Sequence, residues 1–309
     1  MDRRQFVTNA ALAAGFLGLG KPGMSSSKSF KASSISLKAN GFVFDALAAG
    51  PKSGPLILLL HGFPQFSDAW TSVIPQLTRA GYRVIAVNQR GYSKRARPPL
   101  VGDYALTNLV ADAVGFADAV GAPRFHLVGH DWGGAVAWSV AASHSERLYS
   151  LTVLSTPHLD AFAATLNTDP DQQKRSSYFQ LFRAPNHAAE TALLADDAKL
   201  LRGAYVGKVP AAEVDRNVRR FSEDGTLTAA LNWYRASTLG GRPLGSITVP
   251  TTYIWGDQDQ ALGEVAAVST AKYVTGPYHF ERLSGKSHWL LEECPDKVAT
   301  LILNRVKDA

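Results

Sequence analysis

This sequence is poor in cysteine and lacks the G-x-S-x-G motif. Cys294 is the single cysteine among 309 residues, so the chain can form no internal disulfide, and an oxidising compartment is neither required nor excluded. Because G-x-S-x-G does not occur, the chain lacks the serine that this motif supplies as a nucleophile at a strand-to-helix turn. A serine esterase is therefore disfavoured.

The sequence also has no large excess of one charge outside its N-terminal segment, and it has no long apolar run. The formal net charge of +6 arises mainly in residues 1–31, which hold five basic residues and one acidic residue. Residues 32–309 carry 27 basic and 25 acidic residues, a balance that indicates no nucleic-acid partner. The apolar stretch that ends near Leu19 is short and rich in alanine and glycine, whereas a spanning helix needs about 20 strongly apolar residues. We therefore expect no stable membrane span.

The N-terminal segment has a pattern of its own. Arg3 and Arg4 precede Phe6 and Val7, and an apolar stretch follows before a Ser/Lys-rich linker begins. This order resembles a bacterial twin-arginine export signal, which predicts that residues 1–31 are signal peptide and linker and that the protein is periplasmic or secreted. The alternative is a disordered, mildly amphipathic N-terminus without a targeting role.

Beyond the linker, apolar strands alternate with helices. A hairpin turn at Asn40-Gly41 is followed by a rhythm of short buried strands and longer amphipathic segments, which predicts an α/β fold whose mostly parallel sheet is covered by helices on both faces. The expected strands are residues 35–37, 42–47, 57–60, 83–87, 125–128, 151–154, 251–255 and 279–283, and the expected core helices are 69–79 and 106–120.

Between residues 157 and 243 this rhythm stops. Helical patterns such as 190–204 and 227–238 occur there without a convincing strand. We interpret 157–243 as a helical cap inserted into a core made of residues 32–156 and 244–309, lying over the C-terminal ends of the strands. That is the edge where open α/β sheets bind their ligands.

The most informative segment is residues 128–134, VGHDWGG, because it places an aspartate where a hydrolase commonly carries serine. A strand precedes it, a helix follows it, and Gly129 and Gly133 give the small-x-nucleophile-x-small spacing of a sharp turn. Asp131 at the apex sits at a helix N-terminus, which favours the anion. The alternative is that Asp131 only caps the helix.

A carboxylate nucleophile restricts the reaction. It attacks amides and esters poorly, but it can displace a leaving group at a strained or activated saturated carbon and form an alkyl ester. Water must then cleave that ester. Opening of an epoxide and cleavage of a carbon–halogen bond both fit this two-step scheme.

Three further loops supply the groups that ester cleavage needs. Residues 61–64, HGFP, follow the strand 57–60, and the backbone N–H groups of Phe63 and Trp132 can form an oxyanion hole. His288 follows the last strand and can act as general base on water. Asp257 and Asp259 both follow the strand 251–255, and spacing alone does not decide which of them orients His288.

Together these residues resemble the α/β-hydrolase-fold epoxide hydrolases over residues 35–305. The resemblance implies that Asp259 is the acid of the triad and that Tyr178 and Tyr234 polarise the epoxide oxygen. It also implies hydrolysis of an epoxide to a vicinal diol without metal or cofactor. The matching segments are 61–64 (HGFP), 89–93 (QRGYS), 129–134 (GHDWGG), 155–158 (STPH), 178–185 (YFQLFRAP), 232–235 (NWYR) and 285–289 (GKSHW).

The aromatic side chains of Phe63, Trp132 and Trp289 predict an apolar or aromatic epoxide as substrate, with water as the second reactant. One alternative is a haloalkane dehalogenase that uses the same Asp-His-Asp set, although Phe63 offers no side-chain donor to a halide. The other is an exported ligand-binding protein that keeps the site without turnover. The sequence gives no indication of the oligomeric state.

Overall fold

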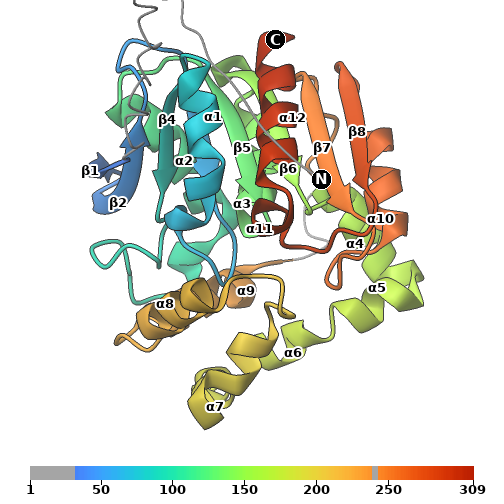
Figure 1. The fold of residues 1–309 in the computed structure, drawn as a ribbon. Helices are drawn as coiled ribbons and strands as arrows, with labels where there is room; N and C mark the ends of the chain where they lie inside the picture. The colour runs from blue at the N-terminus through green and yellow to red at the C-terminus, as the bar shows by residue number, and fades with distance from the viewer. Residues whose placement is uncertain (1–31, 239–242) are drawn as a thin grey trace, which may run out of the picture. The chain divides into compact units, whose positions relative to one another are not determined.

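The computed structural model describes residues 32–238 and 243–309 (Figure 1). The predicted export signal and most of the linker fall in residues 1–31 and lie outside the described residues. Across the two described ranges, no helix is both long enough and apolar enough to cross a membrane.

The centre of the fold is an eight-stranded sheet with the order β1-β2-β4-β3-β5-β6-β7-β8. The hairpin of β1 and β2 turns at Asn40 and Gly41, both with positive φ, and β2 pairs antiparallel with β4. All other pairings are parallel, as predicted. The strands are β1 (Ser33–Ala39), β2 (Phe42–Ala49), β3 (Leu56–Leu60), β4 (Arg83–Val87), β5 (Phe125–His130), β6 (Leu148–Leu154), β7 (Thr251–Gly256) and β8 (Tyr278–Leu283).

Helices cover both faces of the sheet because the central strands are apolar on both sides. In β3, Leu58 and Leu60 pack into one core cluster and Ile57 and Leu59 into the other. The first cluster includes side chains of α2 (Leu106–Ala119) and α3 (Trp132–Ser143), and the second includes those of α1 (Ile74–Arg79) and α12 (Pro295–Lys307). The prediction of an α/β sheet buried between helical layers is confirmed.

Two predicted helices are interrupted. The segment 69–79 is not one helix: a 3₁₀ helix, η1 (Ser67–Ser72), precedes α1, which begins next to Pro75 because proline fits only the first turn of an α-helix. The predicted helix 190–204 belongs to α7 (Ala188–Gly203), whose backbone leaves helical geometry at Ala195 and has positive φ from Asp196 to Ala198.

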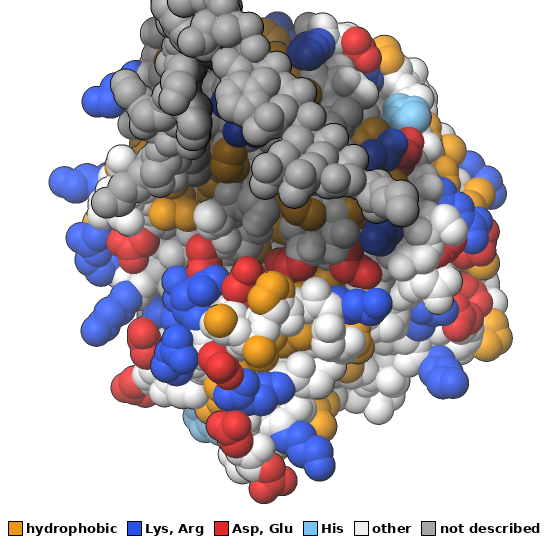
Figure 2. Space-filling view, in the orientation of Figure 1, with side chains coloured by type: hydrophobic (Ala, Val, Ile, Leu, Met, Phe, Trp, Pro, Cys, Tyr) orange, Lys and Arg blue, Asp and Glu red, His pale blue; other side chains and the backbone are white. Residues whose placement is uncertain are grey.

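Six helices lie between β6 and β7 in the part of this insertion that is described, and that part contains no strand. Figure 1 shows α5 to α9 below the sheet, at the end where β5 delivers Asp131. Acidic and basic side chains intermingle on the visible outer surface of the lower helices (Figure 2). The helices are α4 (Leu159–Thr168), α5 (Pro170–Arg175), α6 (Tyr178–Phe182), α7, α8 (Ala211–Phe221) and α9 (Thr226–Ala236).

Specific contacts hold the insertion to the α/β core. The Trp233 indole on α9 donates to the Arg90 carbonyl at 2.8 Å, and the Tyr205 hydroxyl donates to the Pro64 carbonyl at 2.6 Å. Asp68 of η1 pairs with Arg216 and Arg220 of α8 at 2.6 and 2.7 Å. These contacts fix the insertion against the loops that follow β3 and β4.

Candidate active site

Asp131 stands at the sharp turn between β5 and α3. Its backbone has φ 51° and ψ −121°, a strained combination for a residue with a side chain. A Cβ atom on Gly129 would overlap the Gly133 carbonyl, and one on Gly133 would overlap the Leu60 carbonyl. Glycine is therefore required at both flanking positions, and the turn can hold Asp131 at its apex.

The Asp131 carboxylate faces the two predicted backbone donors. The Phe63 N–H donates to its Oδ1 at 2.7 Å, and the Trp132 N–H contributes to lowering the pKa of this carboxyl. Burial by itself raises the pKa of Asp131, but the hydrogen bond and charge of His288 outweigh it and bring the pKa below its usual value. Asp131 is therefore ionised at neutral pH.

His288 lies between two carboxylates. Its Nδ1 is 2.8 Å from Oδ2 of Asp259, and its Nε2 is 3.6 Å from Oδ2 of Asp131. Asp257, by contrast, accepts a hydrogen bond from the Gly285 N–H at 2.7 Å on the exposed side of the loop. The structure thus brings Asp259, and not Asp257, against the imidazole.

The second oxygen of Asp259 is also engaged. Its Oδ1 accepts hydrogen bonds from the N–H groups of Ala261 and Leu262 at 2.8 and 3.0 Å. The carboxylate is 1% exposed, so its orientation toward His288 is fixed by a buried turn.

The two carboxylates control the charge of His288. Burial lowers the pKa of its imidazole, but the charge of Asp259 and hydrogen bonds to Asp131 and Asp259 raise it to about 10. In the free protein His288 is therefore an imidazolium at neutral pH. Neutralising either of the two carboxylates would lower this pKa and favour loss of the proton.

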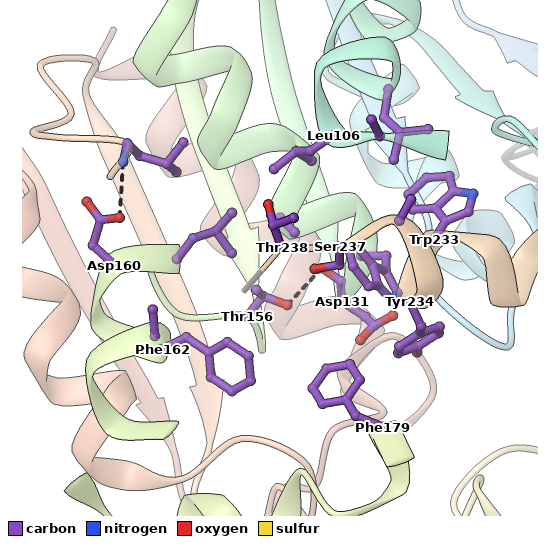
Figure 3. A pocket seen from close by; sticks show the side chains of 18 of the residues that line it. Leu106, Asp131, Thr156, Asp160, Phe162, Phe179, Trp233, Tyr234, Ser237 and Thr238 are labelled. Carbon is purple, nitrogen blue, oxygen red and sulfur yellow. Dashed lines mark hydrogen bonds between the residues drawn. The ribbon is translucent and has the colours of Figure 1, made fainter. Parts of the chain in front are cut away.

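Tyr178 on α6 and Tyr234 on α9 line the same cavity as Asp131. Figure 3 shows Tyr234 beside Asp131. Their ring centroids are 6.2 Å apart with planes at 79°, and the Tyr234 ring packs edge-on against Trp132 at 5.1 Å. Burial, followed by the charge of Asp131, raises the pKa of both phenols. Both tyrosines are thus protonated donors in the cavity that the carboxylate lines.

The cavity has a volume of about 670 Å³ and is bounded by the N-terminal ends of α2 and α3, by the loops after β6 and β7, and by the inserted helices. Thr156, which also lines the cavity, donates a hydrogen bond to the Asp131 carbonyl at 2.8 Å. Figure 3 shows Phe162 and Phe179 pointing into the cavity from the insertion. Sequence reasoning missed both phenylalanines. Phe179 adjoins Tyr178 in a matched segment and could have been noticed, whereas the pattern around Phe162 carries no such signal. The aromatic and aliphatic lining includes Leu106, Trp132, Leu159, Phe162, Phe179, Trp233, Leu244 and Leu262.

Two of the residues predicted to contact substrate lie outside the lining of this cavity. Trp289 does not line the cavity, because its indole is 2% exposed and packs on Tyr205 and on His288, each with ring centroids 5.1 Å apart. The Phe63 ring is also absent from the lining and packs among other aromatic rings, among them Phe182 at 5.3 Å. Only the backbone N–H of Phe63 reaches Asp131. Trp132 lines the cavity.

The sequence is similar to proteins of one fold family. A family profile described as "alpha/beta hydrolase fold" matches residues 55–295. "AB hydrolase superfamily protein YfhM" of Bacillus subtilis is 36% identical over 280 residues, covering 88% of this chain and 97% of that protein. Epoxide hydrolase A of Mycobacterium tuberculosis is 30% identical over 311 residues, covering 85% of this chain and 94% of that protein. Mouse epoxide hydrolase 4 is 32% identical, covering 89% and 79%.

Solved structures give the same picture. A structure from a set of epoxide hydrolases of hot-environment metagenomes superposes with a TM-score of 0.79 at 28% identity, covering 90% of this chain and 98% of that chain. A mutant epoxide hydrolase of Bacillus megaterium with its product (R)-3-[1]naphthyloxy-propane-1,2-diol has a TM-score of 0.79 at 25% identity, covering 88% and 100%.

Proposed function

Because this chain belongs to the α/β-hydrolase-fold epoxide hydrolases, and so to the hydrolases, we propose that it converts an apolar or aromatic epoxide to a vicinal diol through an ester on Asp131. One observation carries the proposal. The ionised Asp131 carboxylate and the two protonated phenols of Tyr178 and Tyr234 line one largely apolar cavity. That arrangement suits a nucleophile on one side of an epoxide and donors to its oxygen on the other.

In the first step an Asp131 oxygen attacks an epoxide carbon. The bond between that carbon and the ring oxygen breaks, and the oxygen takes the electron pair. A phenol of Tyr178 or Tyr234 hydrogen-bonds the developing alkoxide and gives it a proton. The product of this step is a hydroxyalkyl ester of Asp131.

In the second step the ester changes the charge around His288. Once Asp131 is esterified it carries no negative charge, so one of the two carboxylates that raise the His288 pKa is gone. The proton that His288 then gives up replaces the one that the phenol lost. Neutral His288 takes a proton from water, whose oxygen attacks the Asp131 carbonyl, and the diol oxygen leaves with that proton. The N–H groups of Phe63 and Trp132 stabilise the oxyanion.

A single turnover in ¹⁸O-water tests this mechanism. Because water attacks the carbonyl carbon of the ester, the label should appear in the Asp131 carboxylate, and the first diol formed should carry none. Peptide mass spectrometry after one turnover, with excess enzyme over styrene oxide as probe, gives the measurement. Label found only in the diol would mean direct attack of water on the epoxide and would refute the ester.

A comparison of epoxides with haloalkanes as substrates separates epoxide hydrolysis from its alternatives. We expect diol formation from aryl and aliphatic epoxides to exceed halide release from matched haloalkanes, since two phenols suit an oxygen leaving group. Faster halide release would favour the dehalogenase. Saturable tight binding with negligible turnover would favour a ligand-binding protein.

Asp259→Asn and Asp257→Asn form a matched pair, because both aspartates follow β7 and only Asp259 contacts His288. Asp259→Asn removes the charge that orients and stabilises the imidazolium and should slow ester hydrolysis by about a hundredfold or more. Asp257→Asn should stay within about twofold of the native rate. Rates of hydrolysis from stopped-flow decay of the ester provide the comparison, and the reverse order would assign the role to Asp257.

A further inference from the structure

A second cavity, of about 410 Å³, adjoins the loop that carries His288 and shares no lining residue with the substrate cavity. It is formed by η1, by α8 with the residue before it, and by α11 (Leu290–Glu293), which begins two residues after His288. Ala69, Pro210, Leu291 and Glu292 are among the residues that line it.

Glu292 brings a poorly compensated carboxyl group into this cavity. Its Oε1 accepts a hydrogen bond from Gln65 Nε2 at 2.5 Å, while its buried Oε2 has no partner among residues 32–238 and 243–309. Burial raises the pKa of Glu292 to about 8; the hydrogen bond from Gln65 lowers it only in part, and the charge of Glu213 raises it further.

Two more buried polar atoms connect Glu292 with the active site. Gln65 is 1% exposed and Trp289 is 2% exposed, yet Gln65 Oε1 and Trp289 Nε1 find no hydrogen-bond partner within the described ranges. Gln65 follows Phe63 by two residues, and Trp289 follows His288 directly with ring centroids 5.1 Å apart. Buried polar atoms without a protein partner are normally satisfied by ordered water.

The proposed reaction creates a need for such water. After the first step the alkyl group of the ester occupies the apolar substrate cavity, so water that reached the ester through that cavity would share it with the substrate. We propose that the hydrolytic water enters instead through the second cavity and passes Glu292 and Gln65 to reach His288. Both side chains would act as positioning residues, through water. This inference rests on the proposed function.

Blocking the second cavity tests the inference. Ala69→Trp places an indole in the cavity lining, and Ala212→Trp makes the same change at an exposed position of α8 that does not line it. With styrene oxide as probe, Ala69→Trp should slow ester hydrolysis by at least about tenfold and leave alkylation within about twofold, while Ala212→Trp changes neither. Equal hydrolysis rates in Ala69→Trp and the native protein would overturn the inference, as would equal slowing of both steps.

Gln65→Met provides a second test that keeps the side-chain shape. It should slow hydrolysis selectively, and a high-resolution crystal structure of the native protein should show ordered water within hydrogen-bond distance of Gln65 Oε1, Glu292 Oε2 and Trp289 Nε1. No water at these atoms would overturn the inference. These outcomes are separable from failure of the proposed function, because that failure would show as the absence of any Asp131 ester in the native protein.

Discussion

His288→Gln should leave the protein able to open an epoxide and unable to finish the reaction. Glutamine cannot act as general base, so hydrolysis of the Asp131 ester should slow by about 10²–10⁴-fold. Alkylation should persist, because its nucleophile is Asp131 and its donors are Tyr178 and Tyr234. Intact-protein mass spectrometry after exposure to styrene oxide should therefore show one adduct per chain, and peptide mapping should place it on Asp131.

The control for this experiment is Asp131→Asn, with and without His288→Gln. Removing the carboxylate nucleophile should abolish the adduct in both backgrounds, since the amide cannot form the ester. An unmodified His288→Gln protein after prolonged exposure would argue against the assigned role. So would an adduct that survives Asp131→Asn.

The phenols of Tyr178 and Tyr234 should control the first step instead of the second. Changing either to Phe removes a donor aimed at developing charge, which typically costs about 3 kcal/mol, or about a hundredfold in rate. The loss should fall on alkylation, because the ester step relies on the N–H groups of Phe63 and Trp132. Single-turnover rates of ester formation provide the measurement, and the double variant should be close to inactive while still folded.

Tyr82→Phe is the matched control for these variants. Its ring packs on His126 with centroids 5.8 Å apart and lies outside the substrate cavity, so the same loss of a hydroxyl group should leave ester formation unchanged. Thermal unfolding of all variants would separate a loss of folding from a loss of chemistry. Near-normal epoxide turnover in the double variant would remove the two tyrosines from the mechanism.

The pKa shifts predict how the first step responds to pH. The pKa of Asp131 is lowered and those of Tyr178 and Tyr234 are raised, so the carboxylate stays ionised and both phenols stay protonated across the neutral range. Alkylation should therefore show little dependence on pH between about 5 and 9. The buried arrangement widens this range at both ends, because an ordinary carboxyl or phenol would titrate closer to it.

Much of this protein was determined by local sequence. Strands such as 57–60 are uniformly apolar because both of their faces are buried, and their alternation with helical segments predicted a sheet between helical layers. The turn around Asp131 was equally predictable, since Gly129 and Gly133 are the residues that a sharp strand-to-helix turn demands. In these cases the physical requirement acts within a few residues of the chain.

Tertiary structure decided the rest. Asp257 and Asp259 are both acidic residues after β7, and only the packing of that turn directs Asp259 to His288 and Asp257 to an exposed backbone N–H. Trp289 follows His288 directly, yet its indole turns away from the cavity to pack on Tyr205 of the insertion. A turn or a buried strand depends on a few neighbouring residues, so the sequence predicted it. The direction of a side chain depends on partners distant in the sequence, so only the tertiary structure could decide it.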